Sequence, residues 1–114
     1  MSDCLFCKIS TKQVPAKVLH EDHTVMAFED IAPQAPVHVL VIPRKHIPSL
    51  INLGEGEAQL MGHLTGVLNR IAKERGLEPS GYRVVINNGV DANQSVGHLH
   101  LHLLGGRKFS WPPG

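Results

Sequence analysis

The clearest alternation of polar and hydrophobic positions lies in residues 98–104, where the chain reads His-Leu-His-Leu-His-Leu-Leu. Successive side chains of an extended chain point to opposite faces, so a strand here places the histidines on one face and leucines on the other. A helix would spread the same histidines around its axis. The pattern therefore predicts a β-strand that packs leucines into a core and holds His98, His100 and His102 in a row.

Four other segments have the composition of strands. Residues 17–20 and 25–28 are short apolar runs separated by a polar turn, which predicts a hairpin. Residues 37–43 are almost continuously apolar, as in a central strand that is covered on both faces. Residues 82–87 predict a further strand, whereas the two prolines within residues 31–36 predict a loop there.

One long stretch has the spacing of an amphipathic helix, because its apolar residues recur at steps of three and four. These residues are Leu60, Met61, Leu64, Val67, Leu68, Ile71 and Ala72. Asn52 followed by Glu55 is a typical start signal, and Gly76 after Arg75 is a typical stop. The spacing predicts one long helix whose apolar stripe faces the core.

The order of these elements predicts the fold class. Runs of strands around one long helix, without a strand–helix alternation, indicate an α+β fold. We expect a five-stranded, mainly antiparallel sheet with one long and one short helix, and half-covered faces of the sheet favour a dimer. The 114 residues are enough for one such unit, so residues 1–114 are expected to form a single domain.

Composition excludes several classes of protein. Hydrophobic residues make up 42% of the chain and charged residues 18%, which is typical of a globular domain and not of a disordered or fibrous one. The formal net charge of +1 argues against a broad basic surface for nucleic acid or for an anionic membrane. Any phosphate group is therefore expected to be bound locally.

The N-terminal segment carries both cysteines of the chain. Asp3 can cap a short helix that runs to Ser10, with Cys4 and Cys7 on adjacent turns. The start of the chain lacks the pattern of a signal peptide and no apolar run could span a bilayer, so we expect a cytoplasmic protein. In that compartment the two cysteines are expected to be reduced thiols or metal ligands.

The row of histidines suits two kinds of chemistry. Three imidazoles can ligate a metal ion, or one can act as a nucleophile or general base that its neighbours orient. His38 is the polar exception in a central strand and fits either a buried structural histidine or a member of the site. Asn87, Gln94 and Ser95 flank the polar loop before the histidines, where binding residues and turn-forming residues are both common.

These residues resemble the histidine triad family, and within it the nucleotide-binding Hint branch. The motif of residues 98–104 is complete, and the likeness extends to residues 28–46, 81–83 and 94–96 and to the Trp-Pro-Pro-Gly ending. The resemblance implies a homodimer whose two sheets join into one ten-stranded sheet. It also implies a purine nucleotide ligand such as AMP or GMP, and hydrolysis of adenosine 5′-phosphoramidates to AMP and an amine.

The resemblance implies a role for each histidine of the motif. His100 would be the nucleophile that attacks the α-phosphorus and forms a nucleotidyl-histidine intermediate. His98 and His102 would flank it, contact phosphate oxygens and maintain the proton network, and His38 would be the fourth active-site histidine. If a backbone carbonyl accepts the ring proton of His100, the other ring nitrogen is free to attack.

The resemblance also implies the nucleotide contacts. Ser95 and Asn87 match positions that contact the phosphate and the leaving group, and Asp30 matches the carboxylate that binds the ribose hydroxyls. The apolar walls around the base would be Phe6, Ile9, Phe28 and Ile31. Gly97 departs from the family pattern, because Hint proteins usually have an aromatic residue at this position.

Some relatives bind a structural zinc ion, and the matching residues here are Cys4, Cys7, His46 and His98. Two sulfur and two nitrogen ligands suit tetrahedral zinc, whereas the alternative is two reduced cysteines packed as small hydrophobic side chains. No cofactor is expected for catalysis.

Three other functions remain as alternatives. The chain could be a dinucleoside polyphosphate hydrolase of the Fhit branch, a catalytically inactive module that binds nucleotide or zinc for partner recognition, or a metal carrier that uses the three histidines alone. The resemblance at Ser95 and at the Trp-Pro-Pro-Gly ending favours the Hint branch over the Fhit branch.

Overall fold

The structure is a computed structural model that describes residues 3–114 and confirms an α+β fold. Its helices and strands are α1 (Leu5–Ser10), β1 (Val18–Glu21), β2 (Val25–Glu29), β3 (Val37–Pro43), α2 (Ala58–Glu74), β4 (Tyr82–Val85) and β5 (Leu101–Gly105). Two short 3-10 turns, η1 (Leu50–Asn52) and η2 (Glu55–Glu57), precede α2.

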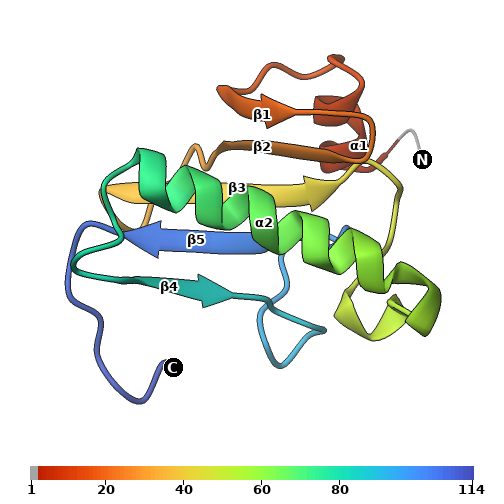
Figure 1. The fold of residues 1–114 in the computed structure, drawn as a ribbon. Helices are drawn as coiled ribbons and strands as arrows, with labels where there is room; N and C mark the ends of the chain where they lie inside the picture. Colours follow the sequence, from red (N-terminus) through yellow and green to blue (C-terminus); the bar gives the residue numbers. More distant parts are fainter. Residues whose placement is uncertain (1–2) are drawn as a thin grey trace.

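The five strands form one antiparallel sheet in the order β1-β2-β3-β5-β4 (Figure 1). The predicted hairpin is present, with β1 and β2 joined at the polar turn. Strand β3 lies in the middle of the sheet and has the predicted bounds. Its nearly continuous apolar sequence is buried on both faces, as expected for a central strand. Strand β5 lies between β3 and β4, so β4 is an edge strand.

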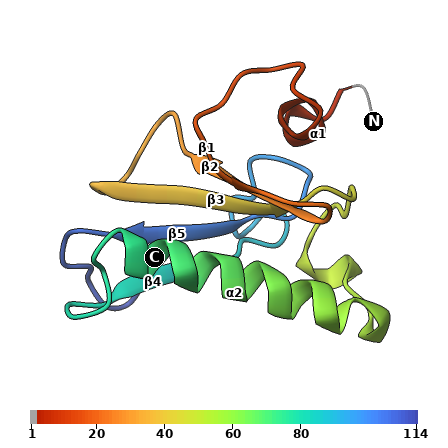
Figure 2. The same ribbon diagram turned by 45° about the horizontal axis from the view of Figure 1, so that its top comes forward.

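The two helices lie on opposite faces of the sheet (Figure 2). The apolar stripe of α2 is buried against Leu99, Leu101 and Leu103, as the alternation of residues 98–104 predicts. Helix α1 packs Phe6 and Ile9 against the other face. The leucines of the motif therefore face α2, and the histidines lie on the side of α1.

The predicted strand at residues 98–104 is too long at its start. Strand β5 begins at Leu101, so His98 and His100 precede the regular ladder. The backbone N–H of Leu99 donates instead to the carbonyl oxygen of Ile47, at 2.7 Å, in the segment that follows β3. Strand β4 is likewise shorter than predicted and ends at Val85.

The predicted helix starts are also wrong. Helix α2 begins at Ala58, because the residues predicted as its start form η1 and η2 instead. In η1 the Ser49 hydroxyl donates to Oδ1 of Asn52, and in η2 Oε1 of Glu57 accepts from the N–H of Gly54. Helix α1 ends at Ser10 as expected, but its N-cap is a cysteine sulfur and not Asp3. Within residues 3–114, no helix has the length and apolar character needed to cross a membrane.

Candidate active site

A cavity of about 200 Å³ opens beside α1, on the histidine side of the sheet. Eight residues expected to contact nucleotide line it: Phe6, Ile9, Phe28, Asp30, Ile31, Ser95, His100 and His102. Asn87 does not line the cavity. The sequence analysis missed further lining residues: Leu5, Val14, Pro15, Ala16, Glu29, Leu40 and Val96. Most of these are apolar residues of loops or ends of elements, which have no local pattern that marks them as binding residues.

The ring of His100 has a defined tautomer. Its Nδ1 lies 2.8 Å from the carbonyl oxygen of His98, and a carbonyl only accepts, so Nδ1 carries the proton. The other nitrogen, Nε2, therefore keeps an unprotonated lone pair. The edge of the Phe6 ring packs against the imidazole, with ring centroids 5.1 Å apart, and the residue is 3% exposed. His100 thus presents a fixed nucleophile or base to the cavity.

His38 and His102 are diagonal neighbours on adjacent strands. His102 of β5 pairs with Leu40 of β3, and His38 lies two residues earlier on the same face of β3. The backbone N–H of Gln34 donates to Nδ1 of His38 at 3.0 Å, so the proton of this ring is on Nε2. The Nε2–H of His38 donates to Nδ1 of His102, with 2.9 Å between the two nitrogens. The same Nε2 lies 3.4 Å from Oδ2 of Asp30.

This arrangement also fixes the tautomer of His102. Its Nδ1 accepts from His38, so its own proton is on Nε2, the nitrogen left for the cavity that His102 lines. Burial, reinforced by the neighbouring His100 and His38, lowers the pKa of His102 to about 4. Burial also lowers the pKa of His38, although the charge of Asp30 opposes the shift. Both rings are therefore neutral near pH 7, and His102 is a neutral hydrogen-bond donor.

His98 lies outside the cavity and is fully buried. Its Nε2–H donates to the carbonyl oxygen of Pro43 at 2.8 Å, so Nδ1 is unprotonated. Nδ1 faces Sγ of Cys4 at 3.3 Å, Sγ of Cys7 at 3.6 Å and Nδ1 of His46 at 3.2 Å. The expectation that His98 contacts phosphate oxygens is therefore wrong, because its only free nitrogen points at the cysteines.

Cys4, Cys7, His46 and His98, which we term the cysteine cluster, have the spacing of a tetrahedral zinc site. Their four ligand atoms all lie within 4.8 Å of one another. Zinc bonds of about 2.0–2.3 Å separate tetrahedral nitrogen and sulfur ligands by about 3.4–3.8 Å, and the distances given above, with 3.4 Å from Cys7 to His46, are close to this range. Burial, with the hydrogen bond and charge of Cys4, raises the pKa of the Cys7 thiol. These residues fit a zinc ion, which would displace that proton.

The loop before the histidines is held by the side chain of Gln94. Its Oε1 accepts from the N–H of Gly89 at 2.9 Å, and its Nε2 donates to the carbonyl oxygens of Pro48 and Val96 at 2.8 and 3.0 Å. Gln94 therefore acts as a turn-forming residue, which the sequence analysis had left open. It keeps the neighbouring Ser95 exposed at the cavity.

Comparisons with known proteins show the family to which this chain belongs. The protein-family model described as "Scavenger mRNA decapping enzyme C-term binding" matches residues 3–110. An uncharacterised HIT-like protein from Synechococcus elongatus is 48% identical over 112 residues, which cover 98% of this chain and 97% of that protein. The chain belongs to the histidine triad (HIT) superfamily.

Solved structures of HIT proteins have the same fold. A HIT family hydrolase from Legionella pneumophila is 45% identical with a TM-score of 0.96, over 98% of this chain and all of that one. A histidine triad nucleotide-binding protein from Candida albicans is 33% identical with a TM-score of 0.82, over 96% of this chain and 83% of that one. The antiparallel sheet with its one long helix is therefore the HIT fold.

The three triad histidines of this HIT protein differ in their surroundings. His100 and His102 line the cavity with opposite tautomers, one offering a lone pair and the other a proton. His98 joins the cysteine cluster and is linked to the cavity only through His100, whose Nδ1–H donates to the backbone carbonyl of His98. The alternation of the motif places all three on one side of the sheet, but neighbouring segments decide what each one contacts.

Proposed function

We propose that the protein hydrolyses purine nucleoside 5′-phosphoramidates, represented by adenosine 5′-phosphoramidate, to AMP and an amine. The observation that carries this proposal is the 2.8 Å hydrogen bond from Nδ1 of His100 to the carbonyl of His98, which leaves an unprotonated nitrogen at the cavity. The names of similar proteins support a nucleotide-directed hydrolase, since one is a HIT family hydrolase and another is nucleotide-binding.

The proposed reaction has two displacement steps. The Nε2 lone pair of His100 attacks the α-phosphorus, and the bond between phosphorus and the amine breaks as the amine takes up a proton. Water then attacks the nucleotidyl-histidine, and the bond between phosphorus and His100 breaks to release AMP. The sum is phosphoramidate and water giving AMP and amine, so no cofactor is consumed.

Neighbouring groups would hold the phosphate and its protons. The Nε2–H of His102 would donate to a phosphate oxygen, and His38 would keep this tautomer in place through its 2.9 Å contact. The exposed hydroxyl of Ser95 would donate to the phosphate or to the leaving amine. Asn87 has no role in this proposal, because it does not line the cavity.

The apolar end of the cavity suits a base, and Asp30 suits a ribose. Phe6 and Phe28 meet edge to face there, with ring centroids 5.5 Å apart, beside Ile9 and Ile31. Oδ1 of Asp30 accepts one bond, from the N–H of Ala32 at 2.9 Å, and each carboxylate oxygen has two lone pairs. The carboxylate would therefore keep acceptor capacity for the hydroxyls of a purine nucleotide such as AMP or GMP.

We further propose that the cysteine cluster holds a structural zinc ion. The ion would tie α1, through Cys4 and Cys7, to the segment that carries His98. The role of this ion would be structural, because the cysteine cluster does not include the proposed nucleophile His100. We also expect a cytoplasmic protein, in which both cysteines would stay reduced and able to bind the ion.

We also propose a homodimer in which β4 pairs with its copy to form a ten-stranded sheet. Strand β4 is an edge strand, and Tyr82 and Val84 on it are 37% and 44% exposed. An exposed apolar edge favours pairing with another strand. Sedimentation of the wild type and of Val84→Lys tests this, since the variant is expected to shift toward monomer.

The deciding experiment is turnover of adenosine 5′-phosphoramidate by the wild type and by His100→Ala, with AMP affinity measured for both. We expect hydrolysis to fall by at least about 1,000-fold in the variant while AMP still binds. His23→Ala, a change of an exposed histidine outside the cavity, is the matched control.

Three outcomes would favour the alternatives. Faster turnover of a diadenosine polyphosphate than of the phosphoramidate would indicate the Fhit type of reaction. A wild type that binds AMP and turns over neither substrate would indicate a binding module. Metal content that falls with His100→Ala and survives Cys4→Ala would indicate a histidine-only metal carrier.

A further inference from the structure

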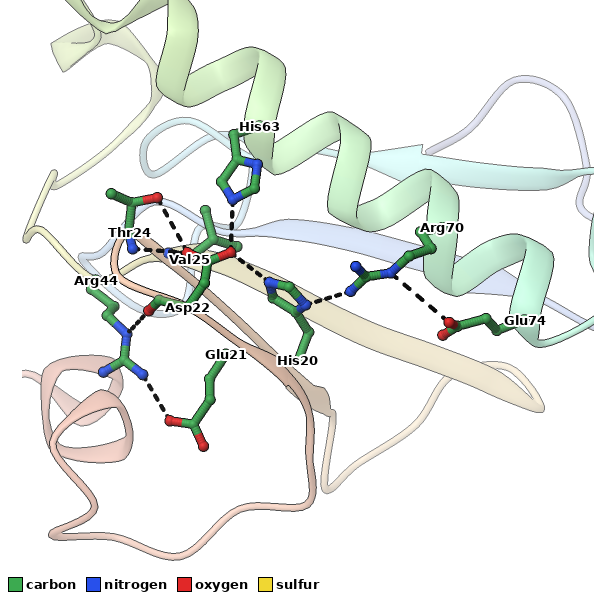
Figure 3. Close-up of polar contacts among 9 residues, drawn as sticks. All are labelled: His20, Glu21, Asp22, Thr24, Val25, Arg44, His63, Arg70 and Glu74. Carbon is green, nitrogen blue, oxygen red and sulfur yellow. Dashed lines mark hydrogen bonds and ion pairs between the residues drawn. The ribbon is translucent and has the colours of Figure 1, made fainter.

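Three polar side chains meet on the side of the sheet that α2 covers, away from the cavity. His20 lies on β1, Asp22 follows it in the hairpin turn, and His63 projects from α2 (Figure 3). Oδ2 of Asp22 is 2.6 Å from Nε2 of His20 and 2.7 Å from Nε2 of His63. We term these residues the Asp22 cluster. It connects the β1–β2 hairpin to the long helix.

We propose that the Asp22 cluster is a second metal site, which takes a divalent first-row transition ion such as Zn²⁺, Co²⁺ or Ni²⁺. Two imidazole nitrogens and one carboxylate oxygen form a ligand set that these ions prefer. The three ligand atoms lie within 4.8 Å of one another and come from two separate elements. The proposal is independent of the phosphoramidase function and of zinc in the cysteine cluster.

The hairpin turn orients the carboxylate of Asp22 before any ion binds. Oδ1 accepts from the backbone N–H groups of Thr24 and Val25 at 2.8 and 2.9 Å. Oδ2 is therefore directed at the two histidines as Figure 3 shows. Burial opposes ionisation, but the hydrogen bonds from His20, Thr24 and His63 outweigh it and hold the pKa of the carboxyl well below its usual range. The carboxylate is thus a fixed anionic ligand.

Solvent can reach the cluster to complete the coordination. The side chains of His20, Asp22 and His63 are 14%, 31% and 46% exposed. Three protein ligands and an open position for water are the arrangement of a zinc site with an exchangeable ligand. The present nitrogen–oxygen distances of 2.6 and 2.7 Å are those of hydrogen bonds, and they must widen to about 3.3 Å, the separation of tetrahedral ligands at zinc bonds of about 2.0 Å, to admit an ion.

Arg70 is the group that competes with the ion. Its guanidinium donates to Nδ1 of His20, which keeps the ring proton on Nε2, the nitrogen that would bind the metal. Binding therefore requires the proton to move to Nδ1 and Arg70 to turn away. Glu74, one helical turn along and 3.9 Å from Arg70, can receive it. Removal of the Arg70 charge should consequently strengthen binding.

The test is a titration of the 114-residue protein with Co²⁺, followed by calorimetry and visible absorption. We expect one equivalent to bind with nitrogen and oxygen ligands only, and so without the thiolate-to-cobalt charge-transfer band that ions in the cysteine cluster produce. His63→Gln should weaken this equivalent at least tenfold, and Arg70→Met should strengthen it severalfold. His23→Gln, which changes an exposed histidine in the same turn, should leave it unchanged.

Three results would overturn the proposal. The first is that His63→Gln binds this equivalent as tightly as the wild type. The second is that His23→Gln weakens it as much as His63→Gln, which is the behaviour of scattered surface histidines. The third is that every bound ion shows the charge-transfer band. Because His63 is half exposed on the helix, circular dichroism can verify that the variant remains folded.

Discussion

The backbone of His98 selects the tautomer of the neutral His100 ring. The Nδ1–H of His100 donates to the His98 carbonyl at 2.8 Å, and His98 is held in turn by the carbonyl of Pro43 at 2.8 Å. A buried carbonyl that accepts from the ring excludes the other neutral tautomer, because that tautomer would leave two acceptors facing each other. The unprotonated Nε2 of His100 is therefore a consequence of how the chain folds around His98.

Replacement of His38 should slow the reaction through the tautomer of His102. His38→Ala removes the donor to Nδ1 of His102, a hydrogen bond whose net contribution of about 1–1.5 kcal/mol corresponds to roughly a tenfold loss in kcat. His38→Gln retains an N–H donor and should recover part of the rate. Steady-state kinetics with the phosphoramidate measure both, and an unchanged kcat in His38→Ala would contradict this role.

Stability should decrease as the pH falls from about 6.5 to about 4. Burial lowers the pKa of His102 from 6.5 to about 4. Between these pH values His102 is protonated in the unfolded chain but neutral in the folded protein. The free energy of unfolding therefore falls with pH, by about 2 kcal/mol in total after allowance for partial exposure. Urea unfolding at a series of pH values measures the slope, and His102→Gln should flatten it.

Removal of zinc from the cysteine cluster should lower the melting temperature. An ion bound at about 100 times its Kd adds about 2.7 kcal/mol, which corresponds to roughly 10–20 °C for a domain of this size. We expect a chelator to produce this loss in the wild type and none in Cys7→Ser. Thr11→Ser, an exposed change just after α1, is the control. Purified protein without zinc and insensitive to the chelator would refute the zinc proposal.

In the proposed phosphoramidase reaction, Gly97 should influence which amine leaving groups the site accommodates. A Cβ built at Gly97 meets nothing within 4 Å, and the residue lines a hollow that shares Leu5, Ser95 and Val96 with the cavity. Gly97→Tyr should therefore fold with a change in the free energy of unfolding below about 0.5 kcal/mol. It should reduce kcat/KM more for phosphoramidates with a bulky amine group than for those with a small one. Gly97→Ala is the control, and equal effects on all substrates would contradict this role.

Gly105 should be intolerant of any side chain. A Cβ at this position would lie 2.6 Å from Cδ1 of Leu77, which is buried in the core against β5. Gly105→Ala should reduce the free energy of unfolding by about 1–3 kcal/mol. Gly62→Ala on the exposed side of α2, where nothing lies within 4 Å, should instead be neutral or stabilising by up to about 1 kcal/mol. Urea unfolding of the two variants compares them directly.

The sequence predicts the framework because local patterns reflect burial. The apolar run of β3 is buried on both faces, and the stripe of α2 is buried against the leucines of the motif. Both signals depend only on the period of side-chain directions along the chain. Helix starts were harder to predict, because polar residues that often start an α-helix can also lie in 3-10 turns. Here Asn52 lies in η1 and Glu55 in η2.

The site was predicted less completely because it is assembled from distant segments. The role expected for His98 was wrong because its direction depends on Pro43 and on the two cysteines, which the alternation of residues 98–104 does not include. Val14 and Ala16 have the sequence pattern of ordinary apolar loop residues, and they line the cavity only because of how α1 packs on the sheet. The register of β3 on β5, which brings His38 to His102, also has no local signal in the sequence.

The position of β5 between β3 and β4 has a consequence for the order of folding. This strand pairs with both β3 and β4, and the segment before it completes the cavity and the cysteine cluster. A nascent chain that stops before residue 98 leaves β3 with an unpaired edge and cannot form either feature. The β3–β5 partners lie 60 to 68 positions apart, from Val41 with Leu101 to Val37 with Gly105, so we expect this pairing to form later than the local β1–β2 hairpin.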